Sequence, residues 1–215
     1  MFATYLELGL SHILDLKGVD HLLFLAALVL TYRLRQWRSV LILATAFTLG
    51  HSITLALASL DVISVDSHLV EIFIAGSIAM TAAYNIWKII KHPENYHQVA
   101  IVQSKADLLD EPIMTAPMSR SLRLDASYAM ALLFGLIHGL GFSNFFKAIL
   151  GKDAITFPLF AFNVGVEIAQ VIIVIIVLLL SAAFAKIFPK GYRIYLLAIL
   201  GVILLWSLKM VIERL

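Results

Sequence analysis

Long apolar runs separated by short polar segments set the pattern of this chain. We predict six main helices, at about 18–32, 39–60, 68–90, 127–149, 157–187 and 192–212. Most of them reach the ~20 residues that a helix needs to cross about 30 Å of hydrocarbon. A shorter segment, 2–16, precedes them, and we expect a re-entrant half-helix, an interfacial helix or the outer part of a broken first helix. The pattern therefore predicts an all-α, polytopic transmembrane bundle with six or seven spans.

Composition supports membrane insertion. Of the 215 residues, 61% are hydrophobic and 14% are charged, and the mean hydropathy is +0.96. An ordinary soluble domain is about 45–50% apolar and about 25% charged. The start of the chain, MFATYLELGL, has no basic region and no small-residue cleavage site, so we expect it to belong to the mature protein. The chain has no cysteine, which excludes disulfides, thiolate metal sites and thiol nucleophiles.

Basic residues predict the orientation. Lys and Arg are frequent in the first loop, 33–38, in and around 92–125, and at 186–193, whereas the alternate loops 61–67 and 150–156 hold one Lys between them. The positive-inside rule places the three basic loops in the cytoplasm. The segment 92–125 is polar and contains three prolines, so we expect a flexible cytoplasmic loop that separates a first membrane half, 1–91, from a second, 126–215.

The two halves share short motifs. FTLGH at 47–51 and FGLIH at 134–138 both read F-x-L-x-H, and VEI occurs at 70–72 and at 166–168. The helices that carry each pair run in the same direction in the predicted topology, which indicates a parallel internal repeat. The VEI match is imperfect, because its glutamate opens the helix in one half and lies about ten residues into the helix in the other.

Ionisable residues inside the apolar runs are the candidate functional site. Such a side chain costs about 2.5–3.5 kcal/mol at the centre of a membrane helix, so it needs compensation. Imidazole and carboxylate bind Ni²⁺, Co²⁺ or Zn²⁺ where thiolate is absent, and a divalent cation would allow the carboxylates to stay ionised. The predicted metal ligands, which all fall in the outer half of the bilayer, are His12, Asp20, His21, His51, His138 and Glu167.

The spacing sets a condition on this site. His12 and His21 are nine positions apart, so an unbroken helix would put them on opposite faces. They converge only if Lys17-Gly18 breaks the helix. We expect nearby polar residues to orient the ligands: Ser11, Thr48, Ser52, Asn163 and Gln170.

Two further features have a structural explanation as well as a functional one. Glu71 is a weaker candidate ligand, because an acid at a helix N-terminus also interacts favourably with the helix dipole. Gly135 and Gly139 form a G-x-x-x-G pattern, which predicts close helix packing next to His138.

Four ordered motifs, SHILDLKGVDHLLFL, FTLGHSITLAL, GLIHGLGFS and FNVGVEIAQ, resemble the HupE/UreJ family of bacterial membrane proteins, particularly its second branch. The resemblance covers most of the chain outside 92–125. It implies a multi-pass protein of the bacterial inner (plasma) membrane with a role in nickel or cobalt uptake that accompanies hydrogenase and urease assembly. Carried over by motif, it implies the same six metal-handling residues.

Three functions stay open. A divalent-cation permease is favoured. Because the chain has no nucleotide-binding motif, such a permease would work by facilitated transport or be driven by an ion gradient. Its inner half offers only Thr81 and Asn85 as further polar residues that could bind the cation on its way. An intramembrane hydrolase could use the His/Asp cluster and Ser52 to hold zinc and activate water. In a metal-free scaffold the polar residues would only join helices. The expected partners are the lipid bilayer and the divalent cation, with a homo-oligomer as an open alternative and no nucleic acid.

Overall fold

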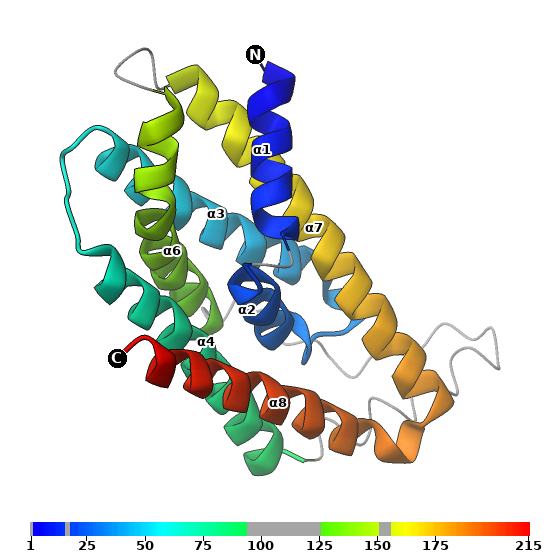
Figure 1. The fold of residues 1–215 in the computed structure, drawn as a ribbon. Helices are drawn as coiled ribbons and strands as arrows, with labels where there is room; N and C mark the ends of the chain where they lie inside the picture. The colour runs from blue at the N-terminus through cyan, green and yellow to red at the C-terminus, as the bar shows by residue number, and fades with distance from the viewer. Residues whose placement is uncertain (1, 16–17, 94–125, 151–155) are drawn as a thin grey trace.

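The computed structural model describes residues 2–15, 18–93, 126–150 and 156–215, and every regular element in these ranges is helical (Figure 1). The predicted cytoplasmic loop 92–125 lies almost entirely outside the described residues. The elements are α1 (Phe2–Leu14), α2 (Asp20–Val29), η1 (Leu34–Gln36), α3 (Trp37–Ser59), α4 (Ser67–Lys91), α6 (Ala126–Leu150), α7 (Thr156–Ile187), η2 (Pro189–Gly191) and α8 (Tyr192–Glu213).

Four helical stretches of the described chain are long and apolar enough to cross a membrane: Leu34–Ser59, Ser67–Lys91, Thr156–Ile187 and Pro189–Glu213. The helix predicted at 18–32 is shorter than expected, because α2 has only 10 residues. At 1.5 Å per residue it spans about 15 Å, roughly half the hydrocarbon thickness. The protein is thus an all-helical membrane protein with four such spans, and the count of six stays a prediction.

α1 and α2 form a broken helix. The chain leaves α1 after Leu14 and re-enters a helix at Asp20, with a turn in which the Gly18 amide donates to the carbonyl of Asp15 at 3.1 Å. The predicted break at Lys17-Gly18 therefore matches the described ends of the two helices.

Glycines hold two pairs of helices in close parallel contact. A Cβ atom added to Gly135 of α6 would lie 2.1 Å from the carbonyl oxygen of Phe47 on α3, and one added to Gly139 would lie 2.2 Å from that of His51. The residue numbers rise together along both helices, so α3 and α6 run in the same direction, as predicted. Gly9 of α1 and Gly165 of α7 make the same kind of contact. These approaches place the two F-x-L-x-H motifs side by side.

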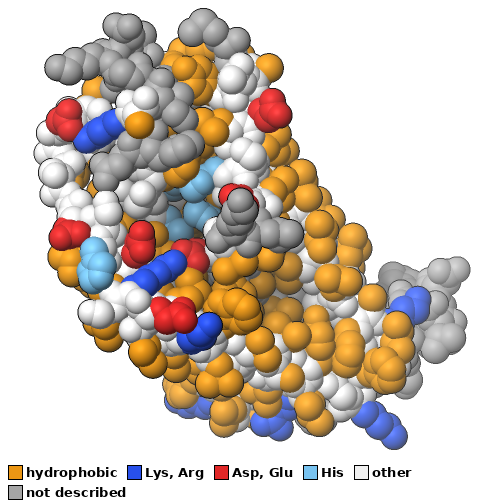
Figure 2. All heavy atoms as spheres, in the orientation of Figure 1, with side chains coloured by type: hydrophobic (Ala, Val, Ile, Leu, Met, Phe, Trp, Pro, Cys, Tyr) orange, Lys and Arg blue, Asp and Glu red, His pale blue; other side chains and the backbone are white. Residues whose placement is uncertain are grey.

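The surface of the bundle is largely apolar. Some Lys and Arg side chains lie along its lower edge, where the end of α4 and η2 lie, and others lie on the viewed face (Figures 1 and 2). Large apolar side chains elsewhere point outward, such as Phe160, Ile194 and Leu205, which are all exposed. An apolar exterior is typical of a protein surrounded by lipid.

Candidate metal centre

The helix break brings His12 and His21 together. His12 lies in the last turn of α1, and His21 lies in the first turn of α2. Their ring centroids are 4.7 Å apart, with the rings edge to face. The break between α1 and α2 allows this contact, because the two rings would point in opposite directions from one straight helix.

Two further histidines come from α3 and α6. The His51 ring centroid lies 6.0 Å from that of His12 and 6.4 Å from that of His21, and the His138 centroid lies 5.0 Å from that of His21. Candidate ligand nitrogens of His12, His21 and His51 all lie within 4.8 Å of one another. Four helices thus supply one imidazole each to a single histidine cluster.

The imidazole nitrogens of this cluster are buried and mostly unpaired. His51 is 0% exposed, His138 is 2% and His21 is 8%. The Nε2 atom of each of the four rings has no hydrogen-bond partner, and neither does Nδ1 of His51. Buried polar atoms without partners are costly and rare in native proteins, so these nitrogens are candidate ligand atoms.

The ring of His138 is oriented by the backbone. Its Nδ1 lies 2.8 Å from the carbonyl oxygen of Phe134, one turn earlier on α6. In the neutral imidazole, Nδ1–H donates to that carbonyl, and Nε2 then carries a lone pair directed away from it. An imidazole fixed in this way is prepared to ligate a metal ion through Nε2.

Phenylalanines surround the cluster. The ring centroid of Phe142 lies 3.9 Å from that of His12. Phe47 and Phe162 both stack on His51, each with its ring centroid 6.2 Å from the His51 centroid. Phe24 lies 5.6 Å from His138. These rings exclude water from the nitrogens and hold the imidazoles in place, which strengthens any interaction with a cation.

One pocket connects the cluster with the surface. It has a volume of about 530 Å³ and is lined by Leu8, Ser11, His12, Leu14, Asp15 and Phe142. Histidine side chains are visible in a hollow between α1 and α6 (Figure 2). Only His12 belongs to both the pocket and the converging nitrogens, so it links the two.

Asp15 was not among the residues singled out from the sequence. It lies three residues after His12, so both side chains share one face of the helix end. The three-residue spacing from His12 is the sequence signal that points to Asp15.

Nearly the whole chain matches one known protein family. The family model described as HupE / UreJ protein matches residues 1–104 and 113–213, which include all four clustered histidines. The chain belongs to the HupE/UreJ family. No curated protein and no solved structure matches it.

In this HupE/UreJ chain the positive charge beside Asp20 comes from Arg214, near the C-terminus. Its Nη2 lies 3.3 Å from Asp20 Oδ2, its Nε lies 3.7 Å from Glu71 Oε2, and its Nη1 donates to the Glu71 carbonyl at 3.0 Å. Asp20 therefore has a charged partner within the protein itself. Arg214 joins the start of α2 to the start of α4, next to His21.

Glu167 and two of the predicted orienting residues, Ser11 and Ser52, have other partners. Glu167 accepts a hydrogen bond from Thr45 at 2.7 Å and, like Asp20, is not in the group of converging ligand atoms. The hydroxyls of Ser11 and Ser52 donate to backbone carbonyls of their own helices instead of to histidines. Orientation of the imidazoles therefore depends on Phe134 and the aromatic rings more than on these hydroxyls.

We predict that Arg214→Gln lowers the free energy of unfolding by about 1–3 kcal/mol, because it leaves the partly buried Asp20 carboxylate without its charged partner. Thermal or denaturant unfolding of the purified protein measures this change. Lys209→Gln is the control: Lys209 pairs with Glu213 at 3.3 Å on the exposed side of α8, and such a pair contributes only about 0.3–0.5 kcal/mol. An equal effect of the two substitutions would contradict a structural role for the Arg214 contacts.

Proposed function

We propose that this chain is a membrane permease for a divalent transition-metal cation of the nickel or cobalt type, and that the histidine cluster binds this cation in transit. The observation that carries the proposal is the clustering of four imidazole rings from four helices, of which His12, His21 and His51 bring ligand nitrogens within 4.8 Å of one another, with buried nitrogens that have no partner. Membership of the HupE/UreJ family supports it. Both features fit a metal substrate better than a packing role, because packing histidines normally pair their nitrogens.

The ligand set suits this class of cation. Neutral imidazole nitrogens bind Ni²⁺, Co²⁺ and Zn²⁺ well, whereas Mg²⁺ and Ca²⁺ prefer oxygen. The ion would bring two positive charges into an apolar region, and the carboxylates of Asp15 and Asp20 lie close by in the chain to offset part of that charge. Protons compete for the same nitrogens, so binding should weaken as the pH falls.

The broken helix provides a route and an element that can move. With the basic loops in the cytoplasm, the pocket at His12 opens on the outer side of the bundle. A cation arriving there would meet Asp15 and His12 first and the buried rings of His21, His51 and His138 next. Discontinuous helices such as the α1–α2 pair typically form the substrate sites of transporters, and such sites open and close as one part of the bundle moves against another.

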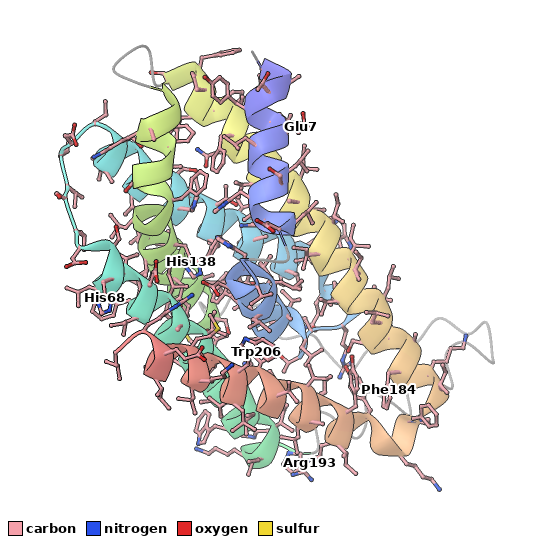
Figure 3. The ribbon with its side chains drawn as sticks, in the orientation of Figure 1. Glu7, His68, His138, Phe184, Arg193 and Trp206 are labelled. Carbon is pink, nitrogen blue, oxygen red and sulfur yellow. The ribbon has the colours of Figure 1, made fainter. Side chains whose placement is uncertain are left out.

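Uptake into proteoliposomes tests this function. We expect the wild-type protein to accumulate Ni²⁺ or Co²⁺, and His138→Ala to abolish most of that uptake. His68→Ala is the matched control, because His68 lies exposed on the first turn of α4, whereas His138 lies inside the bundle (Figure 3). Wild-type vesicles that take up no more metal than empty ones would contradict the proposal.

A zinc hydrolase is the second candidate, and one observation favours it. Three histidine ligands that leave an open position, beside a pocket with a carboxylate, resemble the arrangement of catalytic zinc sites. An enzyme needs a tightly held resident ion, whereas a permease must release its cargo. Stoichiometric zinc that survives dialysis, together with vesicles that take up no metal, would favour the hydrolase.

A further inference from the structure

Two polar contacts join α3 to α7 beside the histidine cluster. The Thr48 hydroxyl lies 3.0 Å from the side-chain amide of Gln170, and the Thr45 hydroxyl donates to Glu167 at 2.7 Å. Gln170 is 0% exposed, and Thr48 is also buried. Thr48 lies three residues before His51 on α3, so its side chain is one helical turn from that imidazole on the same face.

The hydrogen bonds at Gln170 are incomplete. Thr48 Oγ1 lies 3.2 Å from the carbonyl oxygen of Ala44 and 3.0 Å from Gln170 Oε1, but a hydroxyl has only one proton to donate. In this arrangement Gln170 Nε2 has no partner. If the amide turns over, Nε2 donates to Thr48, Thr48 donates to Ala44, and Oε1 becomes the unpaired buried atom. One of these two orientations leaves a bare oxygen, which is an acceptor for a cation.

We propose that Thr48 and Gln170 form a second cation-binding station, in which the hydroxyl and amide oxygens receive the ion after the histidine cluster. This inference rests on the proposed permease function and names the next step of the route. With the basic loops in the cytoplasm, α3 runs outward, so Thr48 lies closer to the cytoplasm than His51.

The chemistry of the station suits release. Neutral oxygens bind nickel-type cations more weakly than imidazoles do, and an ion moves on only where successive sites do not hold it too tightly. The carboxylate of Glu167 lies three residues before Gln170, on the same side of α7, and supplies a negative charge near the ion. Glu167, which the sequence indicated as a metal ligand, thus acts at this station and not in the histidine cluster.

Several other buried polar groups near the predicted cytoplasmic side do have hydrogen-bond partners among the described residues. Asn85 donates to the Ala27 carbonyl at 2.8 Å, and Thr81 donates to the Ser77 carbonyl at 2.9 Å, so the two inner residues expected to serve as stations join or stabilise helices. Ser181 and Tyr192 bond to each other at 2.9 Å and join α7 to α8. Gln170 combines complete burial with a spare amide atom.

The test separates transport from binding. Gln170→Leu should leave the affinity for the first Ni²⁺ or Co²⁺ ion unchanged, and it should slow uptake into proteoliposomes by about 10-fold or more, the usual effect of losing one interaction with a charged group. Ser181→Ala is the matched control: it removes another buried hydrogen bond of α7 and should leave uptake unchanged. Uptake by Gln170→Leu at the wild-type rate would overturn the proposal, as would a loss of first-ion binding equal to that of the histidine variants.

A second variant tests the station by stoichiometry. Gln170→Glu keeps the shape of the side chain and adds a charge, so equilibrium dialysis should find two bound Ni²⁺ or Co²⁺ ions in place of one. A stoichiometry of one would overturn the proposal of a second station. This result is independent of Gln170→Leu, so it holds even if that variant fails to fold. Failure of the permease function is recognised separately, as an absence of metal uptake by the wild-type protein.

Discussion

Purified His51→Phe protein should bind Ni²⁺ or Co²⁺ at least about 100-fold more weakly than the wild type. Loss of a residue that only orients a metal ligand already lowers metal affinity by about 10–100-fold, and His51 is itself a proposed ligand. His51 is fully buried, both of its nitrogens lack partners, and it faces His12 and His21. Phenylalanine preserves the ring that packs between Phe47 and Phe162 and removes the nitrogens. The substitution therefore tests ligation with little change in packing.

Isothermal titration calorimetry measures the affinity. His68→Ala, at the exposed start of α4, should bind metal as the wild type does. His51→Phe should unfold at a temperature close to that of the wild type, or above it, because it no longer buries unpaired polar atoms. Unchanged metal affinity of His51→Phe would remove His51 from the site and leave the packing explanation in place.

Gly135→Ala should lower the free energy of unfolding by about 1–3 kcal/mol or more, the usual cost of overpacking a core. The added methyl group would lie 2.1 Å from the carbonyl oxygen of Phe47 and 3.0 Å from its Cα atom, both of them backbone atoms that no side-chain rotation can move aside. The two helices would have to separate. Because α3 and α6 carry His51 and His138, metal affinity should fall with stability.

Gly76→Ala is the matched control for this prediction. Gly76 also lies inside a helix, α4, but a Cβ atom added there meets nothing within 4 Å. Its replacement should be neutral or stabilise the protein by up to about 1 kcal/mol, since glycine is a poor helix former. Equal unfolding temperatures for the Gly135 and Gly76 variants would show that the close contact of α3 and α6 is not needed for stability.

The sequence predicted most of the helices well. The five later helices begin and end within two residues of their predicted bounds, because long apolar runs with charged or polar ends leave little choice of length. The Asp66 side chain, for example, accepts a hydrogen bond from the His68 amide and fixes the start of α4. The parallel arrangement of α3 and α6 was also predicted correctly from motifs. The four histidines that the sequence singled out lie close together, and their role as metal ligands stays a prediction.

Interactions between distant parts of the chain could not be predicted. Asp20 pairs with Arg214 across nearly the whole sequence, and no periodicity relates the two. α2 is shorter than its apolar run, because Leu30 to Tyr32 form turns that connect to η1 instead of extending the helix. Hydrophobicity is the same in a helix and in an apolar turn, so composition alone could not place that end.

In the proposed function, one divalent cation binds to imidazoles supplied by separate helices. X-ray absorption spectroscopy of the purified protein loaded with one equivalent of Co²⁺ measures this directly, because imidazole ligands give a distinctive multiple-scattering pattern. We predict three or four imidazole nitrogens around the ion, and fewer in His51→Phe. A spectrum with only oxygen ligands, from water or carboxylate, would contradict the account.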